Sequence, residues 1–154
     1  MDVKAAIEKA IALESLFQRA YEKLKHQTKN PAVSQILERL ELDEIEHRHM
    51  LRTGLNYIEH APDLFGDPIV SEEELDEYFE LTNKALSQIE KNEITTLEAL
   101  EKLSSLEMQL KDIHMKYLVP IMDDRLREVF IALSSYDQEH VKVIRKLINR
   151  NDIY

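Results

Sequence analysis

The 154-residue sequence contains no cysteine and no tryptophan, and it has only two glycines and four prolines. Without cysteine the chain has no disulfide framework, thiol nucleophile, iron–sulfur cluster or cysteine-ligated zinc. The scarcity of glycine and proline, beside abundant Ala, Leu, Glu and Lys, is typical of a mostly helical protein. We therefore expect a single domain, residues 1–154, that is large enough to bury a real core.

Basic residues are also in short supply. Asp and Glu number 30 against 20 Lys and Arg, which gives a formal net charge of -10. No basic cluster is long enough to bind phosphates, so the sequence argues against nucleic acid and anionic membranes as partners. No run approaches the roughly 18 apolar residues of a membrane-spanning helix, and the first residues show no signal-type apolar segment. We expect a cytoplasmic protein.

Apolar residues at helical spacing are the main feature that is present. They predict four long helices, arranged as two antiparallel hairpins over residues 3–60 and 95–150. The polar run that ends in Pro31 separates the first two helices, because proline disfavours helix at the residue before it and suits the first turn of the next helix. The short connection makes these two helices an antiparallel pair.

A long crossover, residues 61–94, joins the two hairpins. Ser71 with Glu74 three residues on has the pattern of a capping box, and the apolar spacing that follows predicts an extra amphipathic helix. Thr95 and Glu98 offer a second capping box, at the start of the second hairpin. The predicted fold is all-α, a four-helix bundle with a fifth helix in its crossover.

Ionisable residues interrupt the apolar seams of this bundle. Glu44 and His47 lie three residues apart in the middle of the second helix, so both project to the same side. Asp137 and His140 repeat the pattern near the C-terminus. Each pair faces an acid on the neighbouring helix of its hairpin. The full set is Glu14, Glu44, His47, Glu107, Asp137 and His140. Glu46 and His49 have the same spacing, but their seam is polar and we interpret that pair as surface.

An internal repeat relates the two hairpins. An offset of 93 residues carries Glu14 to Glu107, Glu44 to Asp137, His47 to His140 and Tyr21 to His114. Pairing the hairpins about a pseudo-twofold axis would bring four carboxylates and two imidazoles into the bundle centre, which is the composition of a dinuclear metal site. Without a metal, so many buried acids would lose several kcal/mol of solvation each. An oxygen-rich set with one histidine per metal suits iron or manganese better than structural zinc.

This pattern resembles the ferritin-like di-iron carboxylate superfamily, and within it the rubrerythrin-like branch, over essentially the whole chain. Leu106-Glu107-Met108 and Asp137-Gln138-Glu139-His140 stand where that family has its helical ligand motifs. The resemblance implies a ferritin-like bundle with two metal ions, iron first and manganese or zinc as alternatives. It further implies terminal ligands Glu14 and Glu107, bridging ligands Glu44 and Asp137, and one nitrogen ligand each from His47 and His140.

Three residues qualify the resemblance. Tyr21, one heptad beyond Glu14, resembles the tyrosine common beside such sites, and we take it as a candidate catalytic residue. His114 stands where a tyrosine would be expected; it is a candidate catalytic group, a further ligand, or a satisfied core histidine. Asp137 is one methylene shorter than the family's glutamate, so its bridging role is open. A rubredoxin-like domain needs four cysteines, so any electron donor must be another protein.

The resemblance implies an oxidoreductase that reduces peroxide or dioxygen at a carboxylate-bridged centre, with a response to oxidative stress as its setting. Two alternatives stay open. One is a protein that binds or buffers metal without turnover, and the other is a structural homodimer whose site has lapsed. A homodimer is expected in each case, because relatives of this fold often associate.

Overall fold

The computed structural model describes residues 2–66, 69–118 and 121–150, with the side chains of residues 117 and 118 left out. Its helices are α1 (Val3–Gln27), α2 (Pro31–His60), the short 3-10 helix η1 (Pro62–Leu64), α3 (Glu72–Glu90), α4 (Thr96–Leu118) and α5 (Asp124–Ile148). The only β pairing in these ranges is an isolated bridge between Phe65 and Ile121. The predicted all-α, ferritin-like bundle is therefore confirmed. The predicted domain boundaries at residues 1 and 154 lie outside the described ranges.

Helices α2, α3 and α4 begin at capping residues, and the sequence predicted the caps of α3 and α4. The Asn30 side chain accepts hydrogen bonds from the first backbone amides of α2, and Pro31 occupies the first turn. The Ser71 hydroxyl accepts from the Glu74 amide at 3.1 Å, which opens α3. Thr95 and Glu98 form the complete reciprocal capping box, because each side chain accepts from the other residue's amide. These local signals fix the helix starts and therefore the register of the core residues.

The helix in the crossover ends at a left-handed turn. Asn92 has a φ of 56°, a conformation that asparagine tolerates better than most residues. The amide of the next residue, Glu93, bonds back to the Gln88 carbonyl at 2.9 Å. This closes the C-terminus of α3 and lets the chain turn directly into α4.

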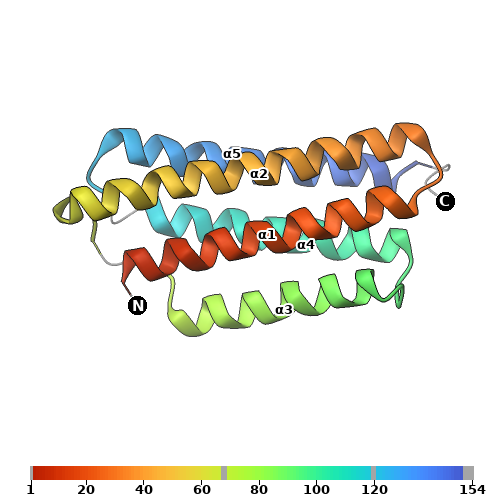
Figure 1. The fold of residues 1–154 in the computed structure, drawn as a ribbon, viewed down its shortest axis with the longest axis horizontal. Helices are drawn as coiled ribbons and strands as arrows, with labels where there is room; N and C mark the ends of the chain where they lie inside the picture. The colour runs from red at the N-terminus through yellow and green to blue at the C-terminus, as the bar shows by residue number, and fades with distance from the viewer. Residues whose placement is uncertain (1, 67–68, 119–120, 151–154) are drawn as a thin grey trace.

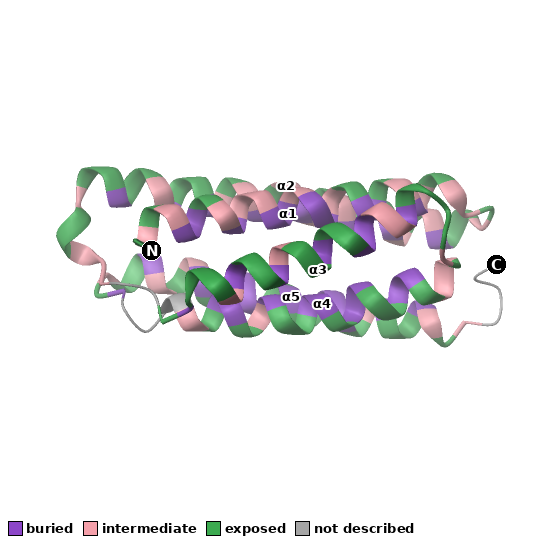
Figure 2. Cartoon of the chain, turned by 90° about the horizontal axis from the view of Figure 1, so that it is seen from below, coloured by how far each residue is buried: buried purple, intermediate pink, exposed green. Residues whose placement is uncertain are grey.

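The four long helices lie side by side, with α3 along one side of the bundle (Figure 1). Helices α1 and α2 form one hairpin and α4 and α5 the other, and α3 packs against α1 and α4. Helices α2 and α5 meet on the side of the bundle away from α3 (Figure 1). The buried stripes of the two hairpins face one another (Figure 2). The crossover helix thus covers one side of the bundle and leaves the α2–α5 side without such a cover.

The repeat seen in the sequence is also a repeat in the core. The offset of 93 residues relates Phe17 to Leu110 and Leu37 to Phe130, and all four side chains are fully buried. Burying side chains of this size stabilises the fold by about 1.5–3 kcal/mol each. None of the described helices is long and apolar enough to cross a membrane.

Candidate metal centre

The six predicted acidic and histidine residues meet at the middle of the bundle. They are Glu14 on α1, Glu44 and His47 on α2, Glu107 on α4, and Asp137 and His140 on α5, each at most 1% exposed. Charged side chains are almost never buried this deeply unless they are paired or bind a metal. The helical periodicity places them there, because each occupies a seam position flanked by leucines and other core residues.

One group of three forms across the first hairpin. His47 Nδ1 lies 3.1 Å from Glu44 Oε2 and 3.4 Å from Glu14 Oε2. The three residues offer ligand atoms that all lie within 4.8 Å of one another. This spacing allows one metal ion to contact all three side chains.

A second group of three forms around the other carboxylate oxygen of Glu44. His140 Nδ1 lies 3.0 Å from Glu44 Oε1 and 3.1 Å from Glu107 Oε1. The rings of His47 and His140 are stacked with their centroids 5.2 Å apart. Glu44 therefore directs one carboxylate oxygen toward each histidine, which is the geometry of a carboxylate shared by two cation positions.

Asp137 lies apart from both groups. Its Oδ2 is 2.6 Å from His114 Nδ1, and His114 Nε2 is 3.4 Å from Glu14 Oε1. These three residues form a third set of potential ligand atoms within 4.8 Å of one another. The resemblance implied a bridging role for Asp137; in the structure its carboxylate lies beside His114. The shorter aspartate reaches less far toward the centre, and an imidazole with two nitrogens is available to hold it there.

The two candidate catalytic residues contact the site from opposite sides. The Tyr21 hydroxyl, from α1, donates a 2.6 Å hydrogen bond to Glu107 Oε1 on α4. His114, from α4, contacts Glu14 on α1. Both contacts cross between the hairpins, so the pseudo-twofold relation between Tyr21 and His114 holds in space. The relation breaks at the two central acids, because Asp137 contacts His114 whereas Glu44 faces both His47 and His140.

Burial and mutual charge shift the titration of the cluster. Burial by itself lowers the pKa of His47, but the Glu44 and Glu14 carboxylates outweigh it and raise the pKa to about 11. The pKa of His140 is also raised, because the Glu107 and Glu44 carboxylates outweigh the effect of burial. Burial, with Glu44 adding to it, raises the pKa of Glu14 to about 7. Burial likewise raises the pKa of Asp137 well above its usual range. These shifts follow from the burial of acids and imidazoles that face one another at the bundle centre.

Unsatisfied oxygen atoms test whether these residues suit a metal. Glu107 Oε2 and Asp137 Oδ1 are buried, and no group in the described ranges donates a hydrogen bond to either of them. A buried carboxylate oxygen without a partner costs about 1–3 kcal/mol or more, and coordination of a cation removes that cost. Carboxylates with imidazoles are a donor set for iron, manganese or zinc. The residues present therefore fit a metal centre.

The sequence interpretation missed two neighbours of the histidines. Asp43 Oδ2 lies 3.2 Å from His140 Nε2, and the Tyr136 ring lies 5.1 Å from the His47 ring. The sequence repeat could have revealed both residues, because the same offset of 93 residues relates Asp43 to Tyr136. Each one precedes the acid of an acid-x-x-His motif and contacts the histidine of the opposite helix. Asp43 orients His140 so that Nδ1, the other ring nitrogen, faces Glu44 and Glu107.

A helical bundle with this buried carboxylate and imidazole cluster defines a class, the non-haem metal-binding proteins of ferritin-like fold. The family model described as Rubrerythrin matches residues 6–118. The chain belongs to the rubrerythrin family. The match spans α1 to α4 with Glu14, Glu44, His47 and Glu107, and it ends before α5, which carries Asp137 and His140. Comparison with curated proteins and comparison with solved structures each gave no match.

Proposed function

We propose that this protein is a non-haem oxidoreductase that holds two metal ions, iron in the first instance, and reduces peroxide or dioxygen. The observation that carries the proposal is the position of Glu44, whose two oxygens face His47 and His140 in two neighbouring groups. A shared carboxylate is what a dinuclear centre needs and what a single structural ion does not use. Membership of the rubrerythrin family supports the same chemistry.

Each residue has a stated role in this proposal. Glu44 would be shared by the two ions, and Glu14 and Glu107 would each hold one ion. His47 and His140 would provide one nitrogen each through Nδ1, the atom that faces the carboxylates. Bound in this way, the two metals would supply the electrons that peroxide reduction consumes. Asp137, whose carboxylate lies beside His114, would be a further ligand on the Glu14 side.

The protein's own groups handle water and protons. The leucines above and below the cluster exclude bulk water, which strengthens every electrostatic contact inside. The Tyr21 hydroxyl holds a proton against Glu107 Oε1 and orients that carboxylate. Burial, followed by the charge of Glu107, raises the pKa of Tyr21 well above its usual range, so the hydroxyl keeps its proton. We assign Tyr21 and His114 as the proton-holding groups beside the reacting centre.

The proposed electron source is a separate protein. The sequence has no cysteine for a rubredoxin-type iron centre, so the proposal includes a separate electron-donor protein. It also includes a homodimer as the working form.

A second candidate function is metal storage or buffering without turnover. The observation in its favour is Asp137, whose carboxylate lies 2.6 Å from His114 Nδ1 instead of between the two histidines of the acid-x-x-His motifs. One bridging carboxylate fewer would leave the ions more weakly coupled and more exchangeable. A structural homodimer with a lapsed site is the third candidate, and it would stay folded without metal.

One experiment separates these functions. The purified chain is loaded with Fe(II) without oxygen, its metal content is measured, and peroxide is added while the visible spectrum is recorded. Two irons per chain with fast, stoichiometric oxidation is the expected result. Bound iron that exchanges freely but does not react with peroxide would favour buffering. Folded protein that holds no metal would overturn the proposal and favour the lapsed site.

A further inference from the structure

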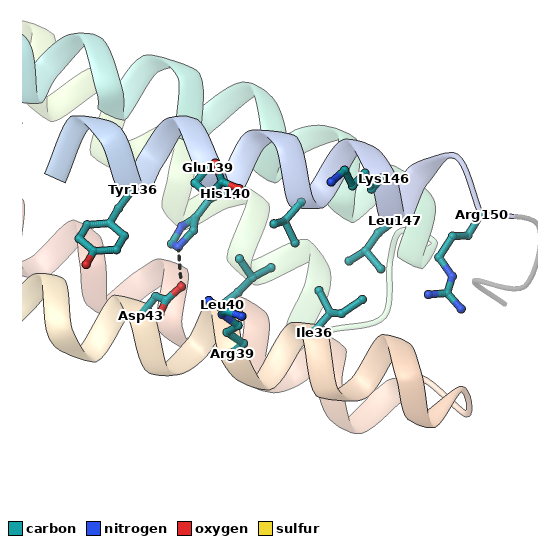
Figure 3. Close-up of a pocket in the computed structure, with 11 residues that line it drawn as sticks. Ile36, Arg39, Leu40, Asp43, Tyr136, Glu139, His140, Lys146, Leu147 and Arg150 are labelled. Carbon is teal, nitrogen blue, oxygen red and sulfur yellow. Dashed lines mark hydrogen bonds and ion pairs between the residues drawn. The ribbon is translucent and has the colours of Figure 1, made fainter. Parts of the chain in front are cut away.

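A groove lies between α2 and α5, on the side of the bundle that α3 does not cover (Figures 1 and 3). Its volume is about 480 Å³, which is in the size range of small-molecule sites. His140 forms part of its wall, so the groove reaches one of the proposed ligand residues from outside. Its polar lining includes Asp43, Glu139, Arg39, Lys146 and Arg150, and its floor is apolar.

The floor of the groove is aliphatic. It is formed by Ile36 and Leu40 on α2 and by Val143 and Leu147 on α5. These side chains recur at helical spacing on two antiparallel helices, so they make a continuous strip and not separate patches. From His140 to Ile148, where α5 ends, the helix axis rises roughly 12 Å, at about 1.5 Å per residue. A strip of this length and polarity suits an extended acyl chain.

Charge is distributed unequally along the strip. The acids Asp43 and Glu139 lie at the end that contains His140, whereas Lys146 and Arg150 lie toward the end of α5 (Figure 3). Arg39 lies between these ends, next to Leu40. A carboxylate would be repelled at the His140 end and attracted at the other, where arginine and lysine donors can bind it. The groove therefore specifies the direction of a bound amphipathic anion.

We propose that this groove binds a fatty acid, with its carboxylate at Lys146 and Arg150 and its chain along the aliphatic floor toward His140. The proposal extends the proposed function, on which its catalytic part rests, by naming fatty-acid hydroperoxides as a substrate class. In that reaction the O–O bond breaks, the hydroperoxide takes up two electrons and two protons, and an alcohol and water are formed. The reductant is the reduced metal pair, one electron from each ion.

Binding is tested first with decanoate, which cannot react. The full chain, metal-free and metal-loaded, is titrated with decanoate and with decylamine, which has the same chain length and the opposite charge. We expect saturable one-to-one binding of decanoate to both forms and at least tenfold weaker binding of decylamine. Equal affinity for the two ligands, or no decanoate binding to either form, would overturn the proposal.

Variants then locate the site. The double variant Lys146→Glu/Arg150→Glu is expected to weaken decanoate binding at least tenfold. The matched control, Arg52→Glu/Arg145→Glu, reverses two exposed charges on α2 and α5 outside the groove and is expected to bind as the unmodified chain does. Val143→Trp fills the floor and should abolish binding, with helicity by circular dichroism as the check on folding. Equal losses in the two double variants would overturn the assigned position.

Turnover measurements separate fatty-acid binding in the groove from peroxide reduction at the metal centre. On the iron-loaded chain, re-reduced by an added electron donor, a fatty-acid hydroperoxide should show a KM at least tenfold below that of tert-butyl hydroperoxide, which lacks both the chain and the charge. Lys146→Glu/Arg150→Glu should raise that KM and leave kcat alone. Decanoate binding without turnover of any peroxide would support the groove and overturn the proposed function. Peroxide turnover without decanoate binding would support the proposed function and overturn the fatty-acid groove.

The oligomeric state gives one further outcome. If Val143→Trp converts a dimer into monomers and decanoate does not bind, the fatty-acid proposal is overturned and the groove is a subunit interface.

Discussion

Asp137 Oδ2 lies 2.6 Å from His114 Nδ1, in a contact between α5 and α4 that has no counterpart at the equivalent position, Glu44, in the first hairpin. Glu44 turns toward the two histidines His47 and His140, whereas Asp137 turns toward His114. The cluster thus combines a repeated sequence pattern with an unequal arrangement of its two central acids.

Lengthening this acid tests the arrangement. We expect Asp137→Glu to keep its metal, because the longer side chain still reaches the Glu14 side and can also extend toward the centre. The peroxidase rate is expected to rise, since a second bridging carboxylate becomes possible. Metal content and peroxide-dependent iron oxidation measure the two effects. Loss of metal would show instead that the cavity is built around the shorter acid.

Removing the shared acid should affect both groups at once. Glu44→Ala is expected to lower the bound iron to one ion per chain or fewer, and His47→Ala to remove at least one ion. Elemental analysis of the loaded variants gives the stoichiometry. Glu46→Ala, an exposed acid on the same helix, is the control and should bind iron as before. Unchanged stoichiometry in both Glu44→Ala and His47→Ala would sink the ligand assignment.

The buried tyrosine should contribute stability of its own. Tyr21→Phe leaves Glu107 Oε1 without its 2.6 Å hydrogen bond from this hydroxyl and keeps the ring packing. We expect the metal-free protein to lose about 1–3 kcal/mol of unfolding free energy in urea. Tyr57→Phe, at a position that is 40% exposed, should change it by less than about 0.5 kcal/mol. Equal effects of the two substitutions would refute the hydrogen bond's contribution.

The partner of His140 should tune metal affinity without setting the number of ions. Asp43→Asn replaces the carboxylate that lies 3.2 Å from His140 Nε2 with a neutral amide. We expect metal affinity to fall about 10- to 100-fold with the stoichiometry kept, because the ring is less well oriented and less basic. Competition with a chelator measures the affinity. Glu38→Gln, at an exposed position of α2, serves as the comparison, and a similar loss there would mean a general charge effect.

Stability of the metal-free protein should depend on pH with an unusual sign. Burial raises the pKa of Glu14 to about 7 from 4.5, so the folded chain keeps a proton that the unfolded chain releases. The unfolding free energy should therefore fall as the pH rises from about 4.5 to 7. The raised pKa of His47, about 11 against 6.5, acts in the same direction above pH 6.5.

Metal binding should reverse this dependence, because ligands must lose their protons to bind. Urea unfolding across this pH range, with a chelator and with bound metal, measures both curves. Two parallel curves would mean that the cluster is not where the metal binds.

The sequence predicted the helices and most of the residues that meet at the bundle centre. Periodicity and caps such as Ser71 predicted the helices, and the spacing of Glu44 and His47 predicted that both would point inward. The family resemblance, with Tyr21 one heptad beyond Glu14, predicted that Tyr21 would lie beside the cluster. These features are local or repeated, so a one-dimensional pattern contains them.

The sequence did not predict which side chains contact each other across different helices. Asp43 and His140 are far apart in the chain, and only the packing of α2 against α5 brings them within 3.2 Å. The choice of Asp137 between the cluster centre and His114 depends on side-chain length and on the distance between α4 and α5. The α2–α5 groove depends on where α3 packs, since that helix covers the opposite side.

The sequence by itself therefore determined the number of helices, their hairpin order and the set of inward-facing acids and histidines, because helical periodicity fixes the direction of each side chain along its own helix. Only the tertiary structure decided which carboxylate meets which imidazole and which face of the bundle stays open. Those outcomes depend on distances between helices, which are set by the packing of all the core side chains together.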